Sequence, residues 1–275
     1  MISDPGSWLL LAAAMLATGG IGGILAGLLG IGGGIVIVPV MEAVLGHLGV
    51  DAAIRMHVAV GTSLATIVPT SIASARAHHR RQAVDLPLVR RWAVFVLLGS
   101  LAGTLIASGV HSDVLSALFG IVALAIAVKM MLPLQGKVLA SGVPRGPLVP
   151  AIPAGIGALS SMMGIGGGTF SVMILTLFNE PIHRAVGTAA LFGLVISLPG
   201  ALGFMLTGIG DPRLPPGSIG YVNLIGFTCI APATFLTAPL GAAIAHGLPK
   251  RRLSLLFGIF LLIVSVRMLY SAWHG

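Results

Sequence analysis

Charged residues are scarce in this sequence of 275 residues. Only 8% of the residues are Asp, Glu, Lys or Arg, whereas 56% are hydrophobic; a soluble domain has about 25% charged residues. A globular core cannot enclose so much apolar surface and still leave a polar exterior. The scarcity of charge therefore argues against a soluble domain and predicts a protein whose outer surface faces the hydrocarbon of a membrane.

Cysteine and the common catalytic motifs are also scarce. The single cysteine, Cys229, excludes an intrachain disulfide and is expected to be a small packing residue. We find no pair of buried carboxylates, no histidine cluster with metal-ligand spacing and no G-x-S-x-G motif, which disfavours a membrane-embedded enzyme. The nucleotide-binding patterns G-x-G-x-x-G and G-K-[ST] are missing at the glycine-rich stretches. We therefore expect no metal and no cofactor.

Apolar runs of membrane length occur throughout the chain. Ten segments are expected to be helical: residues 8–29, 31–48, 54–75, 88–109, 114–132, 148–163, 165–178, 183–206, 219–246 and 253–272. The second, sixth and seventh are shorter than the roughly 20 residues that cross an average bilayer. The pattern predicts an all-α, polytopic membrane protein.

The positions of the basic residues predict its orientation. If the chain crosses at each segment, twelve of the fifteen Lys and Arg residues fall in four loops on one side, and Arg55, Arg213 and Arg267 fall on the other. The positive-inside rule makes the basic side cytoplasmic. Both termini are then outside the cytoplasm, in a protein of the cell (inner) membrane. This distribution accounts for the net charge of +8 without nucleic-acid binding.

Three blocks of sequence occur twice and in the same order. The pairs are residues 30–34 with 164–168, residues 57–62 with 183–188, and residues 115–121 with 253–259. The chain therefore divides into two repeats, residues 1–139 and 140–275. Five segments in each repeat would place the second upside down relative to the first, as in many secondary transporters. If the glycine stretches are re-entrant loops, the symmetry changes.

The first repeated block, Gly-Ile-Gly-Gly-Gly, predicts a helix break in each repeat. Glycines spaced four apart, such as Gly19, Gly23 and Gly27, are typical of close helix packing. Consecutive glycines face every side of a helix and cannot form such a stripe. They more plausibly end one helix and begin the next, which leaves N–H groups without intrahelical partners. Two helix N-termini near the midplane would attract an anion.

Hydroxyl groups near these breaks can add donors to an anion site. The alternative is that each hydroxyl donates to a carbonyl of its own helix. The predicted substrate-binding residues are Gly32, Gly33, Gly34, Thr62 and Ser63 in the first repeat, and Gly166, Gly167, Gly168, Thr169 and Thr188 in the second.

The doubled motif resembles the sulfite exporter TauE/SafE family of membrane transporters. The resemblance rests on Gly-Ile-Gly-Gly-Gly followed by Pro39, then on residues 59–63, Ala-Val-Gly-Thr-Ser, with both parts repeated. It implies transport of sulfur-containing anions such as sulfite and organosulfonates. The second repeat departs from the pattern, since Ala189 replaces the serine and Met173 stands where the first has Pro39.

Four further residues are candidates for gating or coupling: Glu42, His57, His183 and Arg55. A carboxylate deep in a bilayer is often functional, although Glu42 can instead reach an interface if its short segment tilts. The two histidines can titrate during transport or simply supply polarity where a helix meets the interface. Arg55 can steer anions or extend along the interface.

Together these features predict a secondary transporter of small sulfur-containing anions that works by alternating access. Its partners would be the anion, the bilayer and a possible coupling proton or ion. An anion channel with the same site is the alternative.

Overall fold

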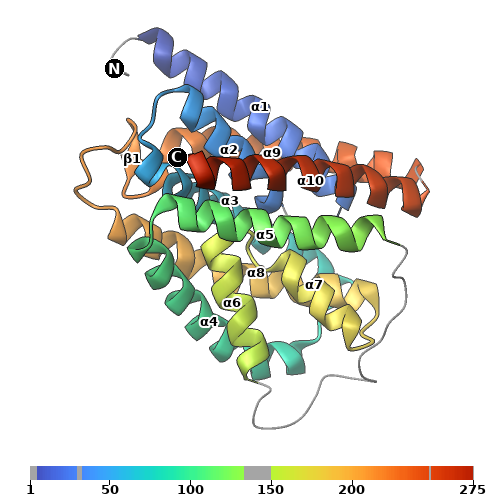
Figure 1. The fold of residues 1–275 in the computed structure, drawn as a ribbon. Coiled ribbons are helices and arrows are strands. Elements are labelled where there is room, and N and C mark those ends of the chain that lie inside the picture. Colours follow the sequence, from blue (N-terminus) through green and yellow to red (C-terminus); the bar gives the residue numbers. More distant parts are fainter. Residues whose placement is uncertain (1–4, 30–32, 133–149, 248, 275) are drawn as a thin grey trace.

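The fold is seen in a computed structural model that describes residues 5–29, 33–132, 150–247 and 249–274 (Figure 1). These residues form helices and one small hairpin. The helices are α1 (Pro5–Leu29), α2 (Gly34–His47), α3 (Ala52–Arg80), α4 (Leu86–Gly109), α5 (Ser112–Met131), α6 (Ala151–Met163), α7 (Gly168–Leu177), α8 (Ile182–Thr207), α9 (Leu224–Gly247) and α10 (Lys250–His274). The strands are β1 (Ser218–Ile219) and β2 (Val222–Asn223).

Each expected segment corresponds to one of these helices, and the all-α prediction is confirmed. The ninth segment differs at its start, because residues 218–223 form the antiparallel hairpin and α9 begins only at Leu224. Gly220 turns the hairpin with φ +53°, in the left-handed region. The N–H of Tyr221 donates to the carbonyl of Phe204 at 2.9 Å. Apolarity alone could not locate this turn.

The helices next to the glycine stretches are short, as expected. α2, α6 and α7 have 14, 13 and 10 residues, and at about 1.5 Å per residue each is shorter than a hydrocarbon core of about 30 Å. Over their described residues, α3, α4, α5, α8 and the Ser254–Trp273 part of α10 are long and apolar enough to cross a membrane. The chain is therefore a multi-pass membrane protein.

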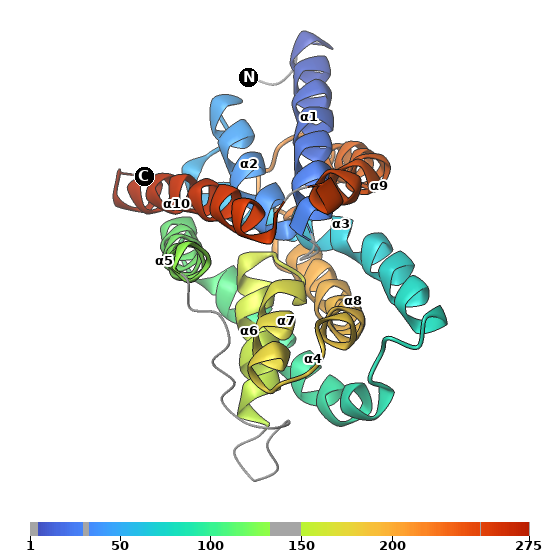
Figure 2. The ribbon, with the colours of Figure 1, turned by 90° about the vertical axis from the view of Figure 1, so that its right-hand side faces the viewer.

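The helices pack in pairs that join the two predicted repeats. α1 lies against α9, α4 against α6, α3 against α8 and α5 against α10 (Figure 2). If each helix of the first repeat is exchanged with the helix at the same position in the second, so that α1 becomes α6 and α4 becomes α9, the same four pairs result. A two-fold relation between the repeats would require this. The inverted orientation of the repeats stays a prediction, and the boundary at residues 139 and 140 lies outside the described residues.

Small residues allow two of these pairs to approach closely. A Cβ atom at Gly19 would lie 2.8 Å from the Ile230 backbone of α9, and one at Gly99 would lie 2.0 Å from the Ala154 carbonyl of α6. Such distances leave no space for a methyl group. The packing role predicted for glycines spaced four apart therefore holds at these positions.

Candidate functional site

Both glycine stretches separate two helices. α1 ends at Leu29 and α2 begins at Gly34, while α6 ends at Met163 and α7 begins at Gly168. In the second stretch, Gly166 and Gly167 have φ values of +65° and +76°, a conformation that favours glycine. The predicted breaks are present, although Gly32 lies outside the described residues.

The two breaks pack directly against each other. A Cβ atom at Gly34, the first residue of α2, would lie 2.3 Å from the carbonyl oxygen of Gly164. The hydroxyl of Ser63 on α3 donates to this same oxygen at 2.8 Å. Ser63 therefore lies beside the glycine breaks, as predicted, but its proton is used to hold the second loop in place.

Several polar groups around the breaks have no partner. Among the described residues, no acceptor receives a hydrogen bond from the N–H groups of Gly34, Gly166, Gly167 or Gly168. The fully buried hydroxyls of Ser160, Ser171 and Ser197 are also without a hydrogen bond. Buried polar groups in native proteins are usually satisfied, so this cluster needs an explanation.

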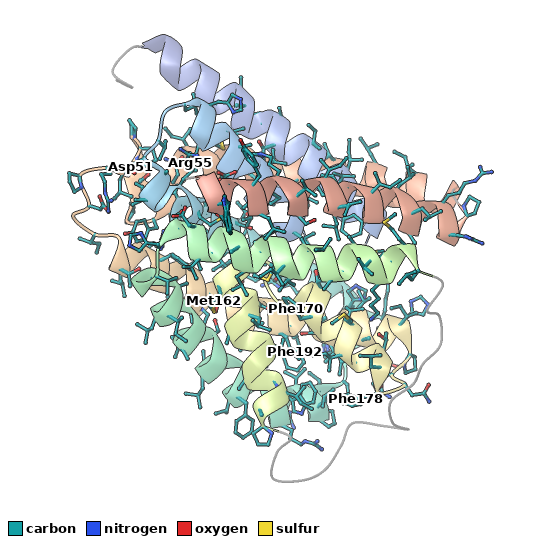
Figure 3. All side chains as sticks on the ribbon, viewed as in Figure 1. Asp51, Arg55, Met162, Phe170, Phe178 and Phe192 are labelled. Carbon is teal, nitrogen blue, oxygen red and sulfur yellow. The ribbon has the colours of Figure 1, made fainter. Side chains whose placement is uncertain are left out.

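The unpartnered serines come from three helices that meet near the second break. Ser160 lies in the last turn of α6, and the N–H of Ile165 donates to its carbonyl. Ser171 lies in the first turn of α7, where side chains tilt towards the helix N-terminus. Ser197 lies on α8, directly after Ile196. A Cβ atom at Gly167 would meet the side chain of Ile196. Phe170 and Phe192 lie in the same region (Figure 3).

Thr62 and Thr188 lie at equivalent places and make equivalent hydrogen bonds. The Thr62 hydroxyl accepts from the N–H of Asn223 at 2.9 Å, and the Thr188 hydroxyl accepts from the N–H of Asp85 at 3.0 Å. Asn223 and Asp85 each precede a helix, α9 and α4, and accept an N–H from that helix. Both threonines thus anchor an N-cap residue, a role that the sequence did not suggest.

The two histidines of the repeated block have different surroundings. His57 is 3% exposed, and its Nε2 lies 2.9 Å and 3.1 Å from the carbonyl oxygens of Ala107 and Val110. Its ring lies 5.0 Å from that of Tyr221. His183 is exposed. A role in coupling stays a prediction for both histidines. Because one is buried and the other exposed, the structure does not favour the same role for the two.

Glu42 is buried, but it lies between two cations. Its carboxylate is 3.6 Å from Arg55 on α3 and 2.8 Å from Arg267 on α10. Asp51 and Arg55 lie at the end of the molecule that carries β1 and the C-terminal turn of α10 (Figures 1 and 3). The corresponding residue in the second repeat, Thr176, donates to carbonyls of its own helix.

The loop before β1 carries a separate ion pair at the same end. Arg213 donates to both carboxylate oxygens of Asp211, at 2.9 Å and 2.7 Å. These hydrogen bonds hold the pKa of Asp211 at about 2, below its ordinary value of 3.8. Asp211 therefore stays ionised at any physiological pH. Burial raises the pKa of the neighbouring Tyr221.

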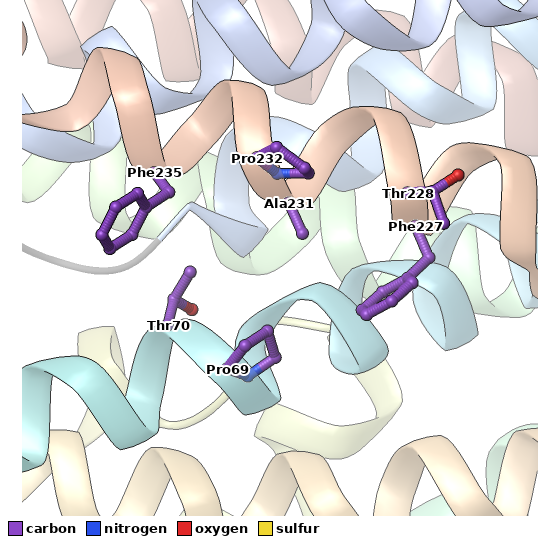
Figure 4. A pocket seen from close by; sticks show the side chains of 7 residues that line it. All are labelled: Pro69, Thr70, Phe227, Thr228, Ala231, Pro232 and Phe235. Carbon is purple, nitrogen blue, oxygen red and sulfur yellow. The ribbon is translucent and has the colours of Figure 1, made fainter.

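A groove of about 570 Å³ lies between α3 and α9, away from these polar groups (Figure 4). Its hydroxyls, those of Thr70 and Thr228, both donate to carbonyls of their own helices. The remaining lining residues are Pro69, Phe227, Ala231, Pro232 and Phe235. The groove is apolar and offers little to an anion.

Sequence reasoning did not single out Ser160, Ser197, Asn223 or Arg267 as site residues. A serine inside an apolar helix gives no sign of whether its hydroxyl has a partner. Arg267 could have been paired with Glu42 only by knowing that α10 lies beside α2. Asn223 stands directly before an apolar run, which is a possible N-cap signal.

The bundle of apolar helices, interrupted twice by glycines, defines a class: a polytopic helical membrane protein with broken helices. The chain belongs to the sulfite exporter TauE/SafE family, whose model matches residues 15–268. A probable membrane transporter protein of Haemophilus influenzae is 34% identical over 92% of this chain and 96% of its own length. Another from Methanocaldococcus jannaschii is 28% identical over 85% and 84%. No solved structure matches significantly.

Proposed function

We propose that the protein is a secondary transporter that moves small sulfur-containing anions across the cell membrane by alternating access. The proposal rests mainly on one observation: two glycine-initiated helices meet where N–H groups and serine hydroxyls are buried without a partner among the described residues. N–H groups at helix N-termini bind oxyanions well. The name of the family, sulfite exporter, points to the same class of substrate.

The anion would be held by neutral donors. On the first repeat these are the N–H groups of Gly33 and Gly34; on the second they are the N–H groups of residues 166–168 together with the Ser171 hydroxyl. Thr169 is largely buried beside them. Such donors suit an oxyanion that carries no proton, because N–H groups cannot accept a hydrogen bond.

Binding would require the two breaks to separate. Gly34 now touches the loop of Gly164, so the N-terminus of α2 is closed against the second repeat. Separation of the repeats on one side and then the other is the motion that alternating access needs. The interchangeable helix pairs support two repeats related by a two-fold axis, and the five helices in each repeat support an inverted orientation. The positions of the basic residues support a cytoplasmic side opposite both termini.

Anion-induced thermal stabilisation of the purified protein tests this proposal. We expect sulfite or a sulfonate to raise the unfolding temperature of the wild type, and Ser171→Ala to weaken that binding about tenfold, the effect of losing one hydrogen bond to a charged group. Ser108→Ala is the matched control, because this half-buried serine lies near the C-terminal end of α4 and its hydroxyl donates to the carbonyl of Leu105. If no anion stabilises the wild type, the proposed site is wrong.

A carrier and a channel are distinguished by flux in proteoliposomes. A carrier shows uptake that saturates with substrate, and substrate on the opposite side accelerates it. Uptake that rises linearly with concentration and lacks this acceleration would favour the channel.

A further inference from the structure

A buried carboxylate held by two guanidinium groups lies at the far end of α2 from the glycine break. We propose that Arg55 and Arg267 form a second anion-binding site there, with Glu42 as its resident counter-ion. The site would receive the transported oxyanion at the mouth of the pathway, so this inference rests on the proposed function.

The geometry places Glu42 between arginines from two different helices. Its Oε2 lies 2.8 Å from Nη2 of Arg267, and its Oε1 lies 3.6 Å from Nη1 of Arg55. Arg267 also donates to the carbonyl of Pro39 at 3.1 Å, and Arg55 donates to the carbonyl of Val50. These carbonyls keep both guanidinium groups in place even when the carboxylate moves.

The triad has one more positive charge than negative charge. Asp51 and Asp211, the other carboxylates in this part of the described chain that take part in ion pairs, both lie within 4.0 Å of Arg213. Neither forms an ion pair with Arg55 or Arg267 among the described residues. A charge that is only partly neutralised near a low-dielectric interior is costly. One bound anion would neutralise the triad itself, whereas the neighbouring group of Arg213, Asp51 and Asp211 has one negative charge in surplus.

The two guanidinium groups are not enclosed by protein. The side chain of Arg267 is 44% exposed and that of Arg55 is 24% exposed, whereas Glu42 is 4% exposed. A guanidinium presents parallel N–H donors that match two oxygens of a carboxylate, sulfonate or sulfite. The ligand is therefore a small oxyanion, approaching on the side opposite the buried carboxylate.

α2 connects this second site to the glycine break. Glu42 follows Gly34 by eight residues, which corresponds to about 12 Å along a helix. The second repeat offers no counterpart, because Thr176 takes the place of Glu42 and bonds within α7. An anion that arrives would take guanidinium hydrogen bonds from Glu42. When the anion moves on towards the break, Glu42 regains them, so the anion is not trapped.

Uptake of labelled sulfite into proteoliposomes, measured over a range of sulfite concentrations, tests the second site. Arg267→Gln should raise the half-saturating concentration about tenfold, as loss of a charge-assisted hydrogen bond predicts, and leave the maximal rate nearly unchanged. Arg267→Lys keeps the charge and should restore part of the affinity. Arg213→Gln is the matched control, because Arg213 is 45% exposed and lies at the same end.

Glu42→Gln should act in the opposite direction. Without the negative charge of Glu42, which competes with sulfite for the two arginines, the arginines should bind sulfite more tightly. The half-saturating concentration should then fall. Because release slows, the maximal rate should drop as well. Thermal unfolding of each variant shows whether it is folded. If Arg267→Gln does not fold, the half-saturating concentration is measured with Arg267→Lys instead.

Two negative results are distinguishable. If sulfite stabilises the wild type but Arg267→Gln, or Arg267→Lys in its place, transports with unchanged half-saturation, the second site is wrong and the glycine site stands. A rise in half-saturation upon Glu42→Gln also overturns it. If no anion stabilises the wild type, the proposed function itself fails.

Discussion

The second repeated block appears at the start of α3 and again at the start of α8, and the two copies share their backbone contacts. A Cβ atom at Gly61 would lie 2.6 Å from the carbonyl oxygen of Tyr221, and one at Gly187 would lie 2.0 Å from that of Ala83. The threonine that follows each glycine accepts an N–H from an N-cap residue. The block thus fixes the loop that begins the neighbouring helix, α9 or α4.

The side chains around the two copies differ. Asn223, beside the first copy, is fully buried and bonds to Pro216, Ser218 and Gly226. Asp85, beside the second, is partly buried and forms an ion pair with the exposed Arg184 at 3.3 Å. The comparison indicates that the repetition preserves a backbone arrangement, while burial and charge differ between the two ends.

The largest effect should come from filling the space at the two glycines. Gly187→Val and Gly61→Val would press side-chain carbons into a backbone carbonyl, and we expect each to lower the free energy of unfolding by about 3 kcal/mol or more. Gly187 should be the more sensitive, because its contact is shorter. Thermal unfolding in detergent measures this.

Gly155→Val serves as the control for that experiment, because a Cβ atom at Gly155 would meet no other atom within 4 Å. If Gly61→Val and Gly187→Val unfold at the same temperature as Gly155→Val, the shared backbone contact is not what the block provides.

The N-cap residues should show the difference between the copies. Asn223→Ala removes a buried side chain with three hydrogen bonds and should cost about 2–3 kcal/mol. Asp85→Ala removes a partly exposed cap and should cost about 1 kcal/mol. Unfolding temperatures of the two variants, each compared with the wild type, test this order. Equal losses would mean that burial does not separate the two copies.

The threonines should show a smaller effect of the same kind. Thr62→Val keeps the shape of the side chain but leaves the buried N–H of Asn223 without an acceptor, a loss of roughly 1–2 kcal/mol. Thr188→Val should cost less, since Asp85 is closer to solvent. If these threonines instead act only on substrate, the variants will unfold like the wild type and lose sulfite-induced stabilisation.

Much of this fold could be predicted from apolar segments and from the repeated blocks. The positions of the helices and both glycine breaks follow from residue type, because consecutive glycines weaken a helix wherever it lies. Orientation relative to the membrane stays a prediction from the Lys and Arg residues in the loops.

The partners of individual polar residues were not predictable, because they depend on which helices become neighbours. Thr62 was predicted as a substrate-binding residue, and nothing in the sequence indicated that its hydroxyl would also accept from the N–H of Asn223, 161 residues further along the chain. Glu42 was expected either deep in the bilayer or at an interface, and only the packing of α10 against the first repeat brings Arg267 to it. Ser197 gains significance only because no described residue satisfies its hydroxyl.

The smallest effect should come from the ion pair that distinguishes the second copy. Arg184→Gln removes a guanidinium whose side chain is half exposed, so we expect a change of about 0–1 kcal/mol in the free energy of unfolding, which decreases further in high salt. Thermal unfolding at low and high salt measures this change. Arg213→Gln, which removes the ion pair with Asp211 in the loop before β1, is measured for comparison. A loss as large as that of Asn223→Ala would show that charge at Asp85 holds α4 in place as firmly as buried hydrogen bonds hold α9.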